Sequence, residues 1–121
     1  MWAKPTKTDL EKLYKNLKIK KTAKDGSTII LSHFFMGSCD WYIVDYDPET
    51  EIMFGYAILN GDIQNSEWGT VFYKEDPNNP CSKGNNLMSL KQEYVEVDYD
   101  KHWTPKPFSE IEKEFKNRYG N

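Results

Sequence analysis

Residues Asp40–Glu49 read Asp-Trp-Tyr-Ile-Val-Asp-Tyr-Asp-Pro-Glu, and this segment is predicted to lie at the centre of an antiparallel sheet. Aromatic and β-branched residues dominate its first half, and such residues favour a pleated strand. The run ends at Asp47-Pro48, where proline presets φ for a turn and aspartate can bond the local backbone. We therefore predict a strand over 41–46 that leads into a hairpin turn.

Strict alternation along this strand predicts the two faces that its side chains occupy. The two sets are Trp41, Ile43 and Asp45 on one face and Tyr42, Val44 and Tyr46 on the other. Both faces carry aromatic rings, which is typical of a strand covered on both sides or of a strand with one side covered by a partner. About half of these rings are therefore expected in the core rather than at the surface.

Similar runs lie on both sides of the central stretch. Further strands are predicted over Thr28–Met36, Ile52–Leu59, Glu67–Tyr73 and Gln92–Tyr99. The stretch 76–91 has no periodic pattern and is rich in Asn, Pro and Gly, so it is predicted to be a long loop. A loop of this length in a small domain is either mobile or functional.

A helix is predicted at each end of the chain. Thr8 and Glu11 have the spacing of a capping box, ahead of an apolar stripe formed by Leu10, Leu13, Tyr14 and Leu17. A closing helix is predicted to start near Pro107 or Ser109, with Ser109 and Glu112 as a second capping box and a stripe of Phe108, Ile111, Phe115 and Tyr119. The prediction is one α+β domain over 1–121, with an antiparallel meander sheet of about five strands flanked by an N-terminal and a C-terminal helix.

Composition limits the class of protein. Aromatic residues make up 15% of the 121 residues, enough to build a core although the hydrophobic share is only 38%. No apolar run approaches the length of a membrane span, and the first residues do not resemble a signal peptide. We expect a cytoplasmic protein in which Cys39 and Cys81 are free thiols.

Charge is distributed unevenly along the chain. Residues 1–26 carry eight lysines against three acids, a net charge of +5, whereas residues 40–76 carry nine acids against Lys74 alone, a net charge of −8. The basic end lacks arginine and the overall charge is −3, so direct nucleic-acid binding is not expected. The acidic segment suggests a surface that meets a basic protein groove; the alternative is an ordinary solvated surface.

No known catalytic or metal-binding motif is present in the sequence. His33 and His102 are the only histidines, and His33, inside an apolar strand, is predicted to be a hydrogen-bonded structural residue. A polar cluster is predicted before the closing helix, formed by Asp98, Asp100, His102 and Trp103. We predict no cofactor and no metal, and we regard a hydrolase that uses Asp98, Asp100 and His102 as a minor alternative.

Several short motifs occur in an order that resembles a family of uncharacterised proteins called DUF2958. They are His33-Phe34-Phe35 with Asp40-Trp41-Tyr42, Asp45-Tyr46-Asp47-Pro48-Glu49, Phe54-Gly55-Tyr56 with Gly61, Glu67-Trp68-Gly69-Thr70-Val71-Phe72, and His102-Trp103-Thr104-Pro105-Lys106-Pro107-Phe108-Ser109-Glu110-Ile111. The chain departs from the family pattern at Tyr73–Asp76 and at Val97-Asp98. The resemblance implies a small protein of a phage, plasmid or other mobile element, with a counter-defence role of the anti-CRISPR or anti-restriction type.

The leading hypothesis is therefore a non-enzymatic interaction protein that binds a protein partner, such as a host defence effector, through an acidic and aromatic sheet face. The expected partner-binding residues are Trp41, Asp45, Tyr46, Asp47, Glu49 and Trp68. The first alternative is a protein that binds a nucleotide or signal molecule in an aromatic pocket, with Lys and Tyr side chains as phosphate and base contacts.

Overall fold

The core of the protein is a five-stranded antiparallel sheet, seen in a computed structural model that describes residues 4–6, 8–10, 12, 22–47, 49–92 and 95–119. The strands, in the order β5-β4-β3-β2-β8 across the sheet, are Glu67–Phe72, Ile52–Ile58, Cys39–Tyr46, Ser32–Met36 and Asp98–Tyr99. Residues 8–10 and 12 are helical, and α2 spans Phe108–Tyr119. The predicted α+β fold is confirmed.

Short elements complete the chain around this sheet. They are β1 (Ile29–Ile30), η1 (Pro80–Ser82), β6 (Lys91–Gln92), β7 (Val95–Glu96) and β9 (Lys106–Pro107). The single strand predicted over Gln92–Tyr99 is wrong in its extent, because β6 and β7 pair with each other and only β8 reaches the sheet, beside β2. The strand predicted over Thr28–Met36 is also divided, since β1 pairs with β9 instead.

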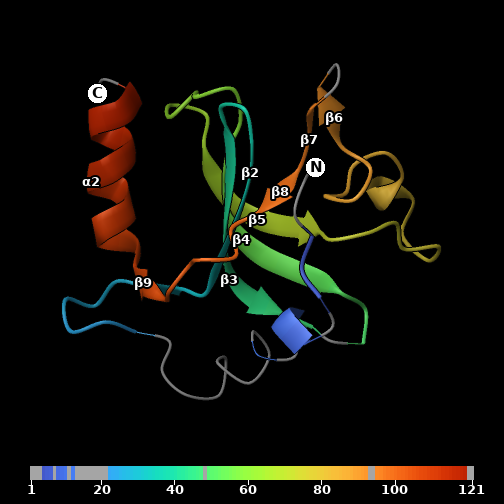
Figure 1. Ribbon diagram of the computed structural model, residues 1–121, viewed down its shortest axis with the longest axis horizontal. Helices are drawn as coiled ribbons and strands as arrows, with labels where there is room; N and C mark the ends of the chain where they lie inside the picture. Colours follow the sequence, from blue (N-terminus) through green and yellow to red (C-terminus); the bar gives the residue numbers. More distant parts are fainter. Residues whose placement is uncertain are drawn as a thin grey trace.

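The two faces of the sheet are covered by different parts of the chain (Figure 1). We call the face that carries Trp41, Ile43 and Met53 the loop face; Leu87 and Val97, from the segment after β5, pack into its core cluster. The opposite face, which we call the helix face, is covered by α2, whose residues Ile111 and Phe115 join a cluster with Tyr42 and Ile58. Of the two alternatives for β3, the structure therefore shows the first, in which the chain itself covers both faces.

A bulge in β3 changes the predicted alternation. The pairing with β4 runs from Ile43 opposite Gly55 directly to Asp45 opposite Phe54, so Val44 has no partner. One extra residue moves every later side chain to the other face. Tyr46 therefore lies on the loop face with Trp41 and Ile43, where the predicted alternation had placed it on the other face.

The helix caps also differ from those that the sequence predicts. At the N-terminal helix the reciprocal pair is Thr6 and Asp9, whose backbone N–H groups donate to each other's side chains at 2.8 and 3.1 Å, whereas Thr8 is already helical. Leu13, Tyr14, Leu17 and Glu11 lie outside the described residues. Ser109 is inside α2, and its hydroxyl donates to Asp25 across the chain. The stripe of Phe108, Ile111 and Phe115 is confirmed, and the side chain of Tyr119 lies outside the described part.

Candidate functional site

The acidic hairpin between β3 and β4 is held by its own backbone. The Asp47 N–H donates to the Ile52 carbonyl at 2.9 Å, and the Asp47 carboxylate accepts from the Glu49 N–H at 2.9 Å. Glu51 pairs with Lys74 at 2.9 Å. The side chains of Asp45, Asp47 and Glu49 are all exposed, so the hairpin presents a concentrated negative charge to solvent. Pro48 lies outside the described residues.

Two exposed aromatic rings lie beside this hairpin on the helix face. Phe54 is 43% exposed and Trp68 is 38% exposed, and their rings stack with centroids 6.3 Å apart at an angle of 9°. Phe54 is directly opposite Asp45 in the ladder. We call these residues, Asp45, Asp47, Glu49, Phe54 and Trp68, the acidic–aromatic patch.

The start of α2 contacts the patch at Trp68 and leaves the Phe54 ring and the hairpin carboxylates exposed. Phe108, the first residue of α2, packs on both Trp68 and Tyr56 with ring centroids 4.8 Å apart in each pair. The helix then runs toward the other end of the sheet, where Arg118 approaches Asp40. A hollow of about 330 Å³, lined in part by Asp45, Asp47 and Phe54, adjoins the patch.

The six predicted partner-binding residues do not all reach the surface. Asp45, Asp47, Glu49 and Trp68 are exposed and belong to the patch. Trp41 and Tyr46 are each only 5% exposed and form part of the loop-face core, so neither ring belongs to the exposed patch. The sequence does not single out Phe54, because the exposure of its ring depends on where α2 begins and on the direction in which the helix runs.

Two members of the predicted polar cluster, Asp100 and Trp103, contact His33, which the sequence did not place in that cluster. The ring of His33 bonds Asp40 through Nε2 at 2.8 Å and Asp100 through Nδ1 at 3.3 Å. Trp103 lies against the same ring, with centroids 5.2 Å apart, and Tyr42 stacks on it at 4.7 Å. The prediction that His33 is a hydrogen-bonded residue inside the sheet is confirmed.

Two members of the predicted cluster remain, His102 and Asp98. His102 is exposed, and its backbone N–H donates to Asp100 at 3.1 Å. Asp98 is half-buried and faces Phe35 across the ladder. The hydrolase hypothesis requires these two side chains to act together with Asp100, and it stays a prediction.

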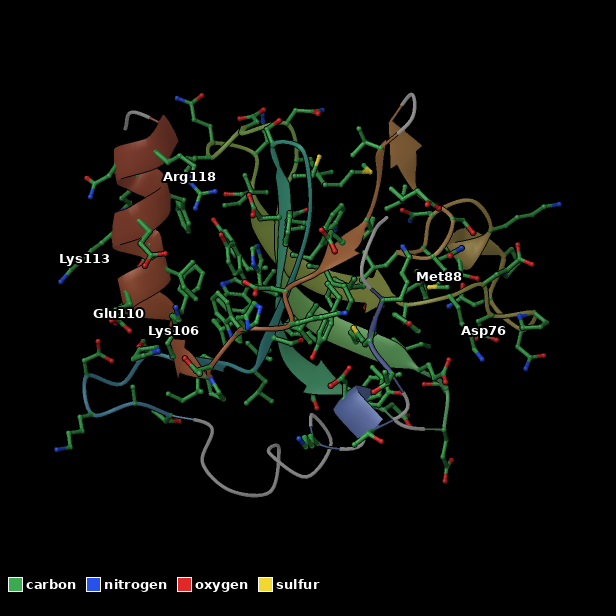
Figure 2. The ribbon with its side chains drawn as sticks, in the orientation of Figure 1. Asp76, Met88, Lys106, Glu110, Lys113 and Arg118 are labelled. Atoms are coloured by element: carbon green, nitrogen blue, oxygen red, sulfur yellow. The ribbon has the colours of Figure 1, made fainter. Side chains whose placement is uncertain are left out.

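The bonds of His33 connect parts of the chain that are distant in sequence. Asp40 is 3% exposed, and a buried carboxylate is costly unless it is paired. Its second oxygen lies 3.8 Å from Arg118, the only arginine of the chain, on the side of α2 that faces the sheet (Figure 2). The network therefore connects β2, β3, the turn after β8 and the end of α2. Its role is structural, because it holds these elements together.

The described part of the chain contains neither a metal-binding cluster nor a membrane-spanning helix. No group of three or more His, Cys, Asp and Glu side chains there is placed to hold a metal ion. No described helix has the length and apolar character that a membrane span needs. Cys39 is buried and Cys81 is exposed, and both are free thiols.

Comparison with known proteins adds no relative to this picture. No family model, no curated protein and no solved structure matches the chain. The resemblance to DUF2958 stays a prediction. The class of protein is thus defined by the fold and the patch alone: a small α+β domain with an acidic and aromatic surface.

Proposed function

We propose that this chain is a non-enzymatic interaction protein whose acidic–aromatic patch binds a basic segment of a protein partner. The observation that carries the proposal is the stacked, exposed pair Phe54 and Trp68 beside the carboxylates of the hairpin. Large aromatic side chains dominate interface hot spots, where their burial supplies most of the binding energy. Exposed rings that already stack on each other lose little conformational freedom when a partner covers them.

The charge around the rings defines the chemistry of the partner. Residues 40–76 carry a net charge of −8, and Asp45, Asp47 and Phe54 are among the residues that line the hollow beside the patch. An arginine or lysine side chain in this hollow would meet carboxylates for charge-assisted hydrogen bonds and a ring face for a cation–π contact. The same field would steer a basic partner toward the patch and speed its association.

The family resemblance extends the proposal to a biological context. If the chain is a product of a phage or other mobile element, its partner is a host defence effector in the host cytoplasm. Restriction and CRISPR effectors bind nucleic acids in basic channels, and carboxylates can occupy the positions of phosphates there. The protein then acts as an inhibitor, with no chemistry of its own.

The first test measures binding of a deca-arginine peptide and capture of proteins from a bacterial lysate. In the triple variant Asp45→Lys, Asp47→Lys and Glu49→Lys, we expect loss of both interactions, and in the unchanged protein we expect binding to weaken as salt rises. Phe54→Ala and Trp68→Ala should each reduce affinity about tenfold or more, as hot-spot truncations do.

The matched control is Glu110→Lys, an exposed charge reversal on α2 (Figure 2). It should leave binding unchanged, and circular dichroism should show that every variant keeps the fold. Binding that survives the triple reversal, or that falls equally in the control, would refute the proposal.

A further inference from the structure

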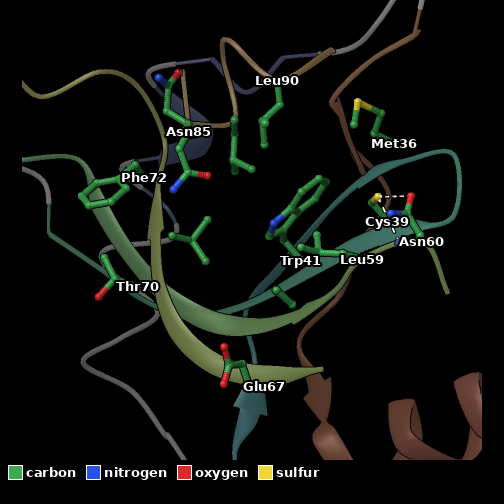
Figure 3. Close-up of a pocket in the computed structure, with 14 residues that line it drawn as sticks. Met36, Cys39, Trp41, Leu59, Asn60, Glu67, Thr70, Phe72, Asn85 and Leu90 are labelled. Carbon is green, nitrogen blue, oxygen red and sulfur yellow. Dashed lines mark hydrogen bonds between the residues drawn. The ribbon is translucent and has the colours of Figure 1, made fainter. Parts of the chain in front are cut away.

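A second candidate site lies on the opposite side of the sheet from the patch. A cleft of about 490 Å³ opens on the loop face between the sheet and residues 85–90, and Figure 3 shows Trp41 among the side chains that line it. Its walls are largely apolar and include Met36, Val71, Leu87 and Leu90. Small-molecule sites have volumes of roughly 300–1,000 Å³ and mostly apolar walls with a few polar groups.

The wall that the loop contributes is already ordered. The Leu87 N–H donates to the Phe72 carbonyl at 2.8 Å, and the Met88 N–H donates to the Tyr73 carbonyl at 3.0 Å, so this turn is attached to the end of β5. Asn86, 1% exposed, donates to the Ser82 carbonyl at 2.8 Å and accepts from the Ser89 N–H at 3.0 Å. A preformed wall lowers the ordering cost of binding.

The polar groups of the cleft define the charge of its ligand. Among the described residues that line it, Glu67 is the one carboxylate, and none is a lysine, arginine, histidine or tyrosine. Asn60 and Asn85 add amide groups at the edge. Among these described residues a phosphate or carboxylate group would find no cation, which argues against a nucleotide as the ligand of this cleft. An ammonium group would find a carboxylate.

We propose that this cleft binds a small hydrophobic amine. The ring or chain of the ligand packs against Trp41 and the aliphatic walls, and its protonated amino group pairs with Glu67 at the edge. Apolar burial supplies affinity and the charge-assisted hydrogen bond supplies selectivity. The proposal does not depend on the patch, because Glu67 faces the loop side of the sheet, opposite Ala57, whereas Phe54 and Trp68 face the helix side.

The test uses three probes with one ring system and three charges: tryptamine (+1), tryptophol (neutral) and indole-3-propionate (−1). Calorimetric titration gives the affinities, and iodoacetamide alkylation followed by mass spectrometry reports the location. Cys39 lines the cleft, and Cys81, exposed and outside it, is an internal reference. We expect tryptamine to bind best and to slow alkylation of Cys39 but not of Cys81.

Variants of the edge carboxylate separate the charge contribution from ring burial. Because Glu67 is exposed, its replacement should leave the fold intact. Glu67→Gln should weaken tryptamine about tenfold or more and leave tryptophol unchanged, since a hydrogen bond to a charged group is lost. Glu67→Lys should reverse the order, so that indole-3-propionate binds better than tryptamine.

Two controls keep this result separate from the patch. Glu110→Gln on α2 should change nothing, and the triple lysine variant of the hairpin should bind tryptamine like the unchanged protein. Equal affinity for all three probes, absence of binding at millimolar concentrations, or binding that fails to protect Cys39 would each overturn the proposal.

Discussion

Replacement of Gly55 by alanine tests how closely β4 approaches β3 next to the bulge. A Cβ atom at residue 55 would lie 2.3 Å from the Tyr42 carbonyl oxygen and 3.1 Å from the Ile43 Cα. A comfortable carbon–oxygen contact is about 3.3 Å, so the two strands would have to separate by about 1 Å. Such a separation weakens two or three ladder hydrogen bonds of about 1 kcal/mol each and adds strain, for a predicted loss of about 2–4 kcal/mol.

The control residue is Gly69, which pairs with Gly55 across the next ladder. A Cβ atom at Gly69 would have no neighbour within 4 Å. Gly69→Ala should therefore be neutral or stabilising by about 0.4–1 kcal/mol, because alanine reduces the entropy of the unfolded chain. Urea denaturation at neutral pH measures both free energies of unfolding. A Gly55→Ala protein as stable as the unchanged one, or equal effects at both glycines, would show that the close approach is not a constraint.

Three further outcomes are expected. Phe115→Ala should cost about 3–5 kcal/mol because the ring is 2% exposed under α2, whereas Lys113→Ala, which points away from the sheet (Figure 2), should change stability by less than about 0.5 kcal/mol in urea denaturation. Burial raises the pKa of Tyr73 to about 12 from 10.0, so the stability that Tyr73 contributes below pH 10 is lost as the pH rises toward 12. Tyr73→Phe should remove this part of the decline in alkaline denaturation curves. Hydrogen bonds from Ser109 and then Ser27 lower the pKa of Asp25 to about 2 from 3.8. The contribution of Asp25 to the free energy of unfolding is present above pH 4 and lost toward pH 2. Any loss of stability in Asp25→Asn at neutral pH should therefore disappear in acid.

Local patterns predicted the elements well where burial and periodicity agree. The aromatic and β-branched runs became β3, β4 and β5, and the apolar stripe of the closing helix packs on the sheet as expected. The predicted strand bounds were wrong where the backbone hydrogen bonds are made with a partner that is distant in the sequence. Val95, Val97 and Tyr99 all pack against the loop-face core, yet β7 pairs with β6 and β8 with β2, because alternation does not specify which strand is the neighbour.

The candidate sites also combine features that the sequence predicts with features that depend on the tertiary structure. The charge of the hairpin and the identity of Trp68 were visible in the sequence, but the exposure of Phe54 follows from where α2 begins and the direction in which it runs. The cleft depends on a turn that is attached to the end of β5, and no local sequence motif predicts this attachment. His33 and Asp40, seven residues apart on neighbouring strands, meet because of the hairpin register, and their link to Arg118 crosses most of the chain.

The α+β class, the central aromatic hairpin and the acidity of residues 40–76 follow from side-chain type and short-range spacing, so they can be predicted from the sequence. Which of the aromatic rings lie in the core and which lie at the surface depends instead on the pairing of strands in three dimensions. A single unpaired residue, Val44, moved Tyr46 onto the face of Trp41 and placed Asp45 opposite Phe54. Side chains alternate between the two faces with a period of two. One extra residue, whose presence is set by pairing with a neighbouring strand, therefore exchanges the faces of every side chain beyond it.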